Sequence, residues 1–206
     1  MSTRVVAISR TTGSGGESIG HIVAERLGFR YVDEEIVAWA AEKAGVEPDL
    51  VADAERRKGL LARFVEGLGK SGVDAGLGLS VALPELSTSK DFQALIGEAI
   101  RETAERGDVV IVAHAASIAL AGRGDLVRVL VTASPEARAH RLAEAGGVGK
   151  EDAQRAVKRA DAARADYLKR FYRIDEELPT HYDLVVNTDV LELDAAADIV
   201  VRAARP

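Results

Sequence analysis

A glycine-rich stretch near the N-terminus has the residue types and the spacing that suit phosphate binding. Residues 5–8 are apolar and predict a buried strand, and Gly13, Gly15 and Gly16 follow that strand. Residues 17–28 have the pattern of an amphipathic helix. Glycines allow backbone N–H groups to converge on an anion, and the N-terminus of a helix adds a favourable dipole. The stretch therefore favours a phosphate-binding turn over an ordinary tight turn between a strand and a helix.

The charge of this stretch differs from that of the common phosphate-binding loop, G-x-x-x-x-G-K-[ST]. With Gly15 aligned to the second glycine, Arg10 stands at the first glycine and Gly16 at the lysine. Arg10 could supply the cation in place of that lysine, or it could be a solvent-facing loop residue. The hydroxyl of Ser18 could coordinate Mg²⁺, or Ser18 could be a simple residue of the first helical turn.

A long helix expected over residues 150–171 is rich in charge. Its basic residues are Lys150, Arg155, Lys158, Arg159, Arg164, Lys169 and Arg170. Charge runs usually mark a solvated face, and we expect this of most of these residues. Phosphoryl transfer, however, needs cations over the migrating group, often on a mobile arm, and the glycine-rich residues 146–149 could form the hinge. Asp161 and Arg164 are three residues apart and can pair on one face of the helix.

Two further polar residues follow predicted strands. Asp33, after a strand at 29–32, could orient a substrate hydroxyl or a metal-bound water, and it could also cap a helix over 34–44. His114 follows the apolar strand at 108–113. A lone histidine is more often structural, and contact with a phosphate or a substrate is the alternative.

Aromatic residues make up only 4% of the chain, and several of them lie in or after the long helix. They are Tyr167, Phe171, Tyr172 and Tyr182. We expect them to pack the helix against the body of the protein, with base stacking as the less favoured interpretation.

The elements that position these residues alternate between strands and helices. Strands are expected over 4–9, 29–32, 108–113, 126–131 and 182–187, and helices over 17–28, 34–44, 49–68, 90–106, 150–171 and 195–204, with one or two helical turns at 116–121. A further helix opens at Pro135 with Ser134 as its cap, and Asp194 is expected to cap the last helix. Alternation of this kind predicts an α/β protein with a parallel sheet covered on both faces. Ligands of such sheets bind at the carboxyl ends of the strands.

Composition narrows the functional classes. The chain of 206 residues suits one domain, and its net charge of −6 disfavours nucleic acid or an anionic membrane as a partner. The chain has no cysteine, which excludes disulfides and thiolate chemistry. The apolar run 109–121 is too short to span a bilayer, and no leader pattern precedes the first strand, so a cytoplasmic location is expected. The apolar helix expected over 49–68 could form a homodimer contact.

Several of these motifs together resemble the cytidylate kinase-like family, a divergent branch of the P-loop nucleoside monophosphate kinases. The motifs are residues 8–10 with 13–16, then 27–33, 107–112, 161–167 and 182–188. The first and fourth are specific, and the others are general α/β patterns. The loop lysine is typically absent from this branch.

The resemblance implies a P-loop kinase-like three-layer αβα sandwich with a five-stranded parallel sheet. The core would comprise residues 1–33, 91–145 and 180–206, the acceptor-binding insertion 34–90, and the helical lid 146–175. The implied reaction is transfer of the γ-phosphoryl group of ATP to a nucleoside monophosphate, with Mg²⁺.

The resemblance also implies roles for individual residues. The ATP-binding residues would be Arg10, Thr11, Thr12, Gly13, Ser14, Gly15, Gly16, Glu17 and Ser18. The residues with catalytic roles would be Arg10, Lys158, Asp161 and Arg164, with Ser18 on the metal. The acceptor-binding residues would be Asp33, His114, Arg159 and Tyr167.

One departure from the family pattern bears on the acceptor. Where the family usually has Gly-Arg-Gly, with the arginine expected on the acceptor phosphate, this chain has Ala113-His114-Ala115. Histidine is shorter than arginine and mostly neutral at pH 7. Two alternatives therefore stand beside a cytidylate-like kinase: a non-catalytic nucleotide sensor on the same fold, and a kinase for a non-nucleotide small molecule.

Overall fold

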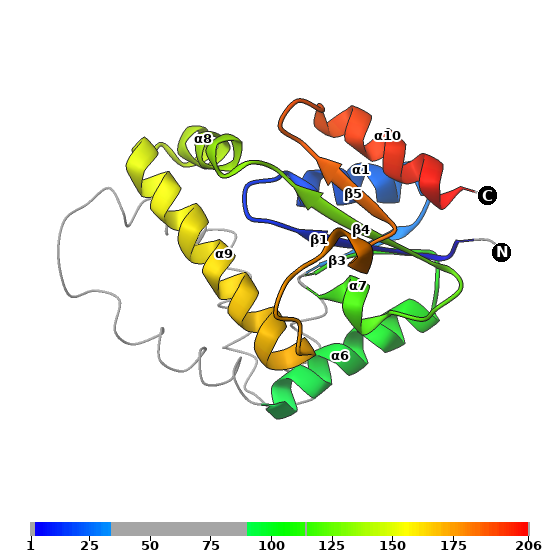
Figure 1. Ribbon diagram of the computed structural model, residues 1–206. Coiled ribbons are helices and arrows are strands. Elements are labelled where there is room, and N and C mark those ends of the chain that lie inside the picture. Colours follow the sequence, from blue (N-terminus) through cyan, green and yellow to red (C-terminus); the bar gives the residue numbers. More distant parts are fainter. Residues whose placement is uncertain (1–2, 34–89, 114, 206) are drawn as a thin grey trace, which may run out of the picture.

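The computed structural model describes residues 3–33, 90–113 and 115–205 (Figure 1). The predicted helices at 34–44 and 49–68 lie outside the described residues, as does His114. The described strands are β1 (Val5–Arg10), β2 (Arg30–Val32), β3 (Val109–Val112), β4 (Leu126–Thr132) and β5 (Leu184–Asn187). All four strand pairings are parallel, in the order β2-β3-β1-β4-β5, which confirms the predicted five-stranded parallel sheet.

The core-forming parts of the central strands β1 and β3 are apolar because both faces of the sheet are covered. Residues 5–8 of β1 and 109–112 of β3 are fully buried. Helices α1 (Gly16–Leu27) and α10 (Leu193–Ala204) pack on one face, and α6 (Lys90–Glu105) and α7 (Ala116–Ala119) pack on the other. The structure is therefore the expected three-layer αβα sandwich.

Two further helices lie beyond the carboxyl ends of the strands. Helices α8 (Pro135–Gly146) and α9 (Lys150–Tyr172) pack against each other through Ala139, Ala153 and Val157. Figure 1 shows α9 running along the side of the molecule where β1 and β4 end, opposite both chain termini. A short 3₁₀ helix, Pro179–His181, then leads to β5.

One predicted helix cap is confirmed and another is wrong. The Ser134 hydroxyl accepts from the Ala137 N–H at 3.2 Å at the start of α8. Helix α10 begins two residues earlier than predicted, so Asp194 lies inside its first turn, where its carboxylate accepts from Arg26 at 2.5 Å. Asp194 thus joins α10 to α1, and its charge still suits the helix N-terminus.

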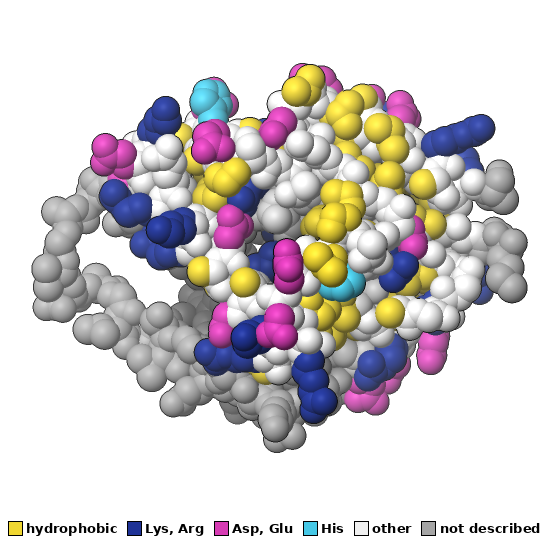
Figure 2. All heavy atoms as spheres, viewed as in Figure 1, with side chains coloured by type: hydrophobic (Ala, Val, Ile, Leu, Met, Phe, Trp, Pro, Cys, Tyr) yellow, Lys and Arg dark blue, Asp and Glu magenta, His cyan; other side chains and the backbone are white. Residues whose placement is uncertain are grey.

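Strand β5 forms one edge of the sheet, and one of its apolar residues, Val185, is exposed. Figure 2 shows hydrophobic side chains gathered over β5 and the segments on either side of it. The large exposed hydrophobic residues of the described chain are Leu178, Val185, Val190, Leu191 and Ile199. Within the described residues, no helix is both long and apolar enough to cross a membrane.

Candidate phosphate-binding site

The turn between β1 and α1 depends on its glycines for conformation and for space. Gly13 and Gly15 have φ of 81° and 79°, in the left-handed region that L side chains rarely adopt. A Cβ on Gly13 would lie 2.9 Å from the Arg138 carbonyl oxygen, and one on Gly15 would lie 2.5 Å from a methyl of Leu193. The fold therefore holds the backbone of this turn in one tight conformation.

The N-terminus of α1 opens onto this turn without a side-chain cap from the described residues. Gly15 occupies the capping position, and the first N–H groups of a helix have no partner within the helix. The buried hydroxyl of Ser14 also has no hydrogen-bond partner in the described part of the chain. Unsatisfied groups of this kind concentrate at functional sites, and convergent N–H groups at a helix start suit an anion.

Arg10 lies beside the start of α1 and pairs with Glu17. Its side chain runs over Gly16, where an added Cβ would lie 2.6 Å from Arg10 Cβ and 3.1 Å from Arg10 Cδ. Arg10 therefore occupies space that a lysine at position 16 would need. Ser18 follows on the exposed side of the first turn of α1.

The buried hydroxyl of Thr188 and the side chain of Arg141 both donate hydrogen bonds to carbonyls of the turn. Thr188 donates to the Ser14 carbonyl at 2.9 Å and receives a hydrogen bond from Arg141 of α8 at 3.0 Å. Arg141 also donates to the Gly13 carbonyl at 3.3 Å. Thr11 meets Thr132, at the end of β4, through their hydroxyls at 3.5 Å. The ends of β4 and β5 thus fix the turn that follows β1.

Arg138 connects α8, α9 and the turn. Its side chain is 4% exposed, and it donates to both carboxylate oxygens of Asp161 at 2.8 and 2.7 Å. It also donates to the Thr12 carbonyl at 3.3 Å. The predicted pairing of Asp161 with Arg164 is therefore wrong, because the packing of α8 on α9 gives Asp161 an arginine from the other helix.

Arg164 is the second buried arginine at the turn, and its partner is Glu177. It donates to the two carboxylate oxygens of Glu177 at 2.8 and 2.5 Å and to the Arg10 carbonyl at 3.3 Å. Burial alone would raise the pKa of Glu177, but the hydrogen bonds and charge of Arg164 outweigh it and lower that pKa. Glu177 is therefore ionised at neutral pH.

A cavity lies where these pairs meet the turn. Its volume is about 190 Å³, and it is lined by Thr11, Arg138, Asp161, Arg164, Ala165, Leu168, Ile174, Asp175 and Glu177. A second cavity of about 360 Å³ lies between α8 and α9, with Lys158 and Asp161 in its lining. Asp161 lines both cavities, and each cavity is also lined by other charged side chains.

The remaining predicted residues lie on α9 and at the end of β2. Lys158 and Arg159 are exposed on α9, and Tyr167 packs with Phe171 and Tyr172 in a half-buried aromatic cluster. Asp33 accepts from the Tyr31 hydroxyl at 3.1 Å at the end of β2. Burial and the neighbouring Asp33 carboxylate raise the pKa of Tyr31, so it is a neutral donor at physiological pH.

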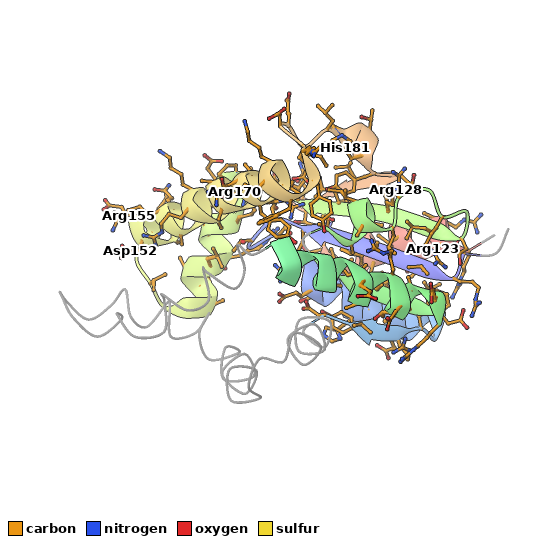
Figure 3. The ribbon with its side chains drawn as sticks, turned by 90° about the horizontal axis from the view of Figure 1, so that it is seen from below. Arg123, Arg128, Asp152, Arg155, Arg170 and His181 are labelled. Carbon is orange, nitrogen blue, oxygen red and sulfur yellow. The ribbon has the colours of Figure 1, made fainter. Side chains whose placement is uncertain are left out.

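Much of the charge on α9 is a solvated face, as predicted. Figure 3 shows Arg155 beside Asp152 at one end of the helix and Arg170 farther along it. Arg155 pairs with Asp152, and Arg170 pairs with Asp166 at 2.9 Å, all with exposed or partly exposed side chains. Exposed pairs of this kind contribute little to stability.

Four residues of the site were not predicted as site residues: Arg138, Arg141, Glu177 and Thr188. Arg138 and Arg141 could have been found from the sequence, because they lie three positions apart on a helix that follows a central strand and so share one face of that helix. Glu177 lies in an irregular segment, and its role depends on where α9 ends.

Comparisons with known proteins agree with this geometry. A cytidylate kinase of Ignicoccus hospitalis is 28% identical over 96% of this chain and 97% of its own length. A solved structure of a protein from Eubacterium ventriosum superposes with a TM-score of 0.68 at 17% identity, covering 98% of each chain. A shikimate kinase from Bacteroides thetaiotaomicron superposes with a TM-score of 0.51 at 17% identity, covering 97% of this chain and 95% of that one.

At such identities the structural likenesses show the fold, which is the αβα fold of the P-loop kinases. The family model described as the cytidylate kinase-like family matches residues 5–190, which is most of the chain. This protein therefore belongs to the cytidylate kinase-like family.

Proposed function

We propose that this protein transfers the γ-phosphoryl group of ATP to a nucleoside monophosphate, with CMP as the first acceptor to test. One observation carries the proposal. Arg138 and Arg164 are the buried charged residues of the described ranges, and both donate to carbonyls of the glycine turn or the residue before it. Buried arginines at a phosphate-binding turn suit a reaction whose transition state spreads negative charge over phosphoryl oxygens.

The turn fits the phosphates of ATP. Its glycines bring the backbone close, the start of α1 is uncapped by described side chains, and Arg10 lies beside it. The exposed Ser18 hydroxyl would hold Mg²⁺ together with phosphate oxygens. A magnesium ion held there would supply positive charge to offset the negative charge of the phosphates.

The protein's own residues would act through positioning and charge. In the reaction an oxygen of the acceptor phosphate bonds to the γ-phosphorus while the bond to the β–γ bridging oxygen breaks, giving ADP and a nucleoside diphosphate. No strong base is required, because the acceptor phosphate is already anionic. Arg10, Arg164 and Lys158 would balance the charge, and Asp161 would hold Arg138 in place.

The acceptor would lie toward the end of β2. Tyr31 fixes Asp33 there, which supports Asp33 as a contact for a hydroxyl of the acceptor. Arg159, Tyr167 and His114 remain proposed acceptor contacts.

The test is a product assay. The protein is incubated with Mg-ATP and each of CMP, dCMP, UMP, AMP and GMP, and the nucleotides are resolved by chromatography. Arg164→Ala is expected to keep ATP affinity nearly unchanged and to lose most turnover. Arg170→Ala on the same helix is the matched control, since Arg170 is exposed and pairs only locally with Asp166 among the described residues.

Each outcome has a definite meaning. A diphosphate from one acceptor supports the proposal and identifies that acceptor. Saturable ATP binding without any diphosphate contradicts nucleoside monophosphate kinase activity and favours a sensor or a kinase for another small molecule. Absence of ATP binding would show that the glycine turn has been misinterpreted. Equal loss of binding and turnover in Arg164→Ala would contradict a role of Arg164 in the transition state.

A further inference from the structure

We infer that Glu177 and Tyr182 are positioning residues, which hold the Arg164 guanidinium against the phosphate-binding turn in the orientation that turnover requires. The inference rests on the proposed phosphotransferase activity and extends it to two residues that the sequence analysis did not assign to the site.

The first step is the geometry of the pair. The side chains of Arg164 and Glu177 are 7% and 19% exposed, so water competes little for their contact. Two roughly parallel hydrogen bonds join the fork of the guanidinium to both carboxylate oxygens. A bidentate contact fixes the plane of the guanidinium as well as its distance, which a single hydrogen bond cannot do.

The second step is the attachment of Glu177 to the sheet. Glu177 lies in the irregular segment after α9, where the backbone alone gives little rigidity. The buried Tyr182 hydroxyl donates to its carboxylate, and Tyr182 also hydrogen-bonds with Ser9 of β1. Ser9 meets Ser117, which donates to the Ala7 carbonyl at 3.2 Å. The carboxylate is therefore tied to the central strand that leads into the turn.

The third step is where Arg164 lies. It donates to the carbonyl of Arg10, the last residue of β1, at 3.3 Å. Arg164 also lines the cavity of about 190 Å³ together with Thr11 and Arg138. The series of contacts begins at the Ala7 carbonyl and ends at Arg164, which donates to the Arg10 carbonyl, so both ends lie on β1. The series therefore sets the position of the Arg164 guanidinium relative to the turn.

This arrangement is expected to affect the reaction rate as well as the packing. An arginine side chain has several rotatable bonds, and a displacement of about 1 Å in a reacting complex can cost on the order of 100-fold in rate. Glu177 restricts those bonds through its two hydrogen bonds to the guanidinium. The neutral Tyr182 donates to the carboxylate, and burial together with the Glu177 hydrogen bond raises its pKa to about 12, so that donor persists at physiological pH.

The experiment compares Glu177→Gln with Glu176→Gln. Both remove one negative charge from adjacent positions, but Glu176 is exposed and lies outside the chain of contacts. The rates are measured at saturating Mg-ATP with the acceptor that the wild-type protein uses. We expect Glu177→Gln to lower kcat by about 10- to 100-fold while the KM for ATP changes by less than about twofold. Glu176→Gln should stay within about twofold of the wild type.

A double-mutant cycle separates positioning from general stabilisation. If Glu177 acts through Arg164, the double variant Arg164→Ala/Glu177→Gln is no slower than Arg164→Ala alone. Glu177→Asp should recover part of the lost kcat, since it restores the carboxylate. Tyr182→Phe removes only one hydroxyl, and it keeps the inference testable if Glu177→Gln fails to fold. We expect it to lower kcat by about 3- to 10-fold.

The outcomes distinguish this inference from the function on which it rests. Wild-type protein that forms no diphosphate would contradict the proposed function, and with it the inference. Active wild-type protein with equal rates in Glu177→Gln and Glu176→Gln would overturn the inference alone. A double variant slower than Arg164→Ala by the full Glu177→Gln factor would also overturn it, because the two residues would then act independently.

Discussion

Exchange of Arg10 and Gly16 tests whether Arg10 takes the place of the loop lysine. In the structure the Arg10 side chain lies over Gly16 and fills the space of any side chain there. The cation can therefore come from position 10 or from position 16, but not from both. The informative variants are Gly16→Lys, Arg10→Gly, and the double variant Arg10→Gly/Gly16→Lys.

The magnitudes follow from two contacts. A Cβ at position 16 would lie 2.6 Å from Arg10 Cβ, well inside van der Waals contact, and overpacking of this kind costs about 1–3 kcal/mol. At this chain length each kcal/mol lowers Tm by about 2–4 °C. Loss of a charged hydrogen-bond donor to phosphate costs about 1.5–3 kcal/mol. That loss corresponds to about 10- to 150-fold in kcat/KM for ATP.

The assay measures kcat/KM for Mg-ATP and the thermal midpoint of each variant. Gly16→Lys should lower both, since the overlap strains the turn. Arg10→Gly should lower kcat/KM and have the smaller effect on Tm. The double variant should regain most of the lost kcat/KM, because the introduced lysine then has both the space and the charge to bind phosphate.

The matched control is Arg10→Ala/Gly16→Lys. Alanine keeps the Cβ that causes the overlap, so this variant should stay destabilised although it differs from the double variant by one methyl group. A double variant no faster than Arg10→Gly would refute the exchange, since a lysine at position 16 would then not replace Arg10, and an unchanged kcat/KM in Arg10→Gly would refute a phosphate-binding charge at position 10. Equal Tm values for the two double variants would refute the steric part.

Three further predictions concern the contacts around the turn. Arg138→Ala should destabilise the protein by about 1–3 kcal/mol in urea unfolding, because it leaves Asp161 and the Thr12 carbonyl without their arginine; a loss equal to that of the exposed Arg155→Ala would contradict the buried pairing. Thr188→Val should raise the KM for ATP and cost about 1–2 kcal/mol of stability, since the Ser14 carbonyl loses the hydrogen bond that the Thr188 hydroxyl donates. Thr188→Ser keeps a hydroxyl and should preserve both the KM and the stability. The stabilisation from Glu177 should depend on pH with a definite sign: its folded-state pKa is lowered from 4.5, so the contribution is complete above about pH 4.5 and is lost as pH falls further. The difference in unfolding free energy between wild type and Glu177→Gln should therefore be constant near neutrality and shrink below that pH, and an unchanged difference in acid would contradict the pairing with Arg164.

The local elements of the fold were predictable because their causes are local. The β-branched, apolar run of residues 5–8, bounded by a glycine-rich turn, favours a strand covered on both faces, and the glycines after it permit the left-handed backbone of the turn. Ser134 followed by Pro135 specifies a helix start through one hydrogen bond and one fixed dihedral angle. Asp194 shows the limit of such reasoning, because a residue suited to a cap also suits the first turn, and its contact with Arg26 depends on how α10 crosses α1.

The amino-acid sequence by itself determined the individual strands and helices and the glycine turn after β1, since each depends on residue order within a short segment, and its motifs indicated the family. The partners of the buried arginines were decided only by the tertiary structure. Helical spacing placed Asp161 beside Arg164, but the packing of α8 on α9 gave Asp161 to Arg138, and the end of α9 brought Glu177 to Arg164. Spacing along one helix identifies which residues can meet on its surface, whereas burial favours the partner that satisfies the most hydrogen bonds once the helices have packed.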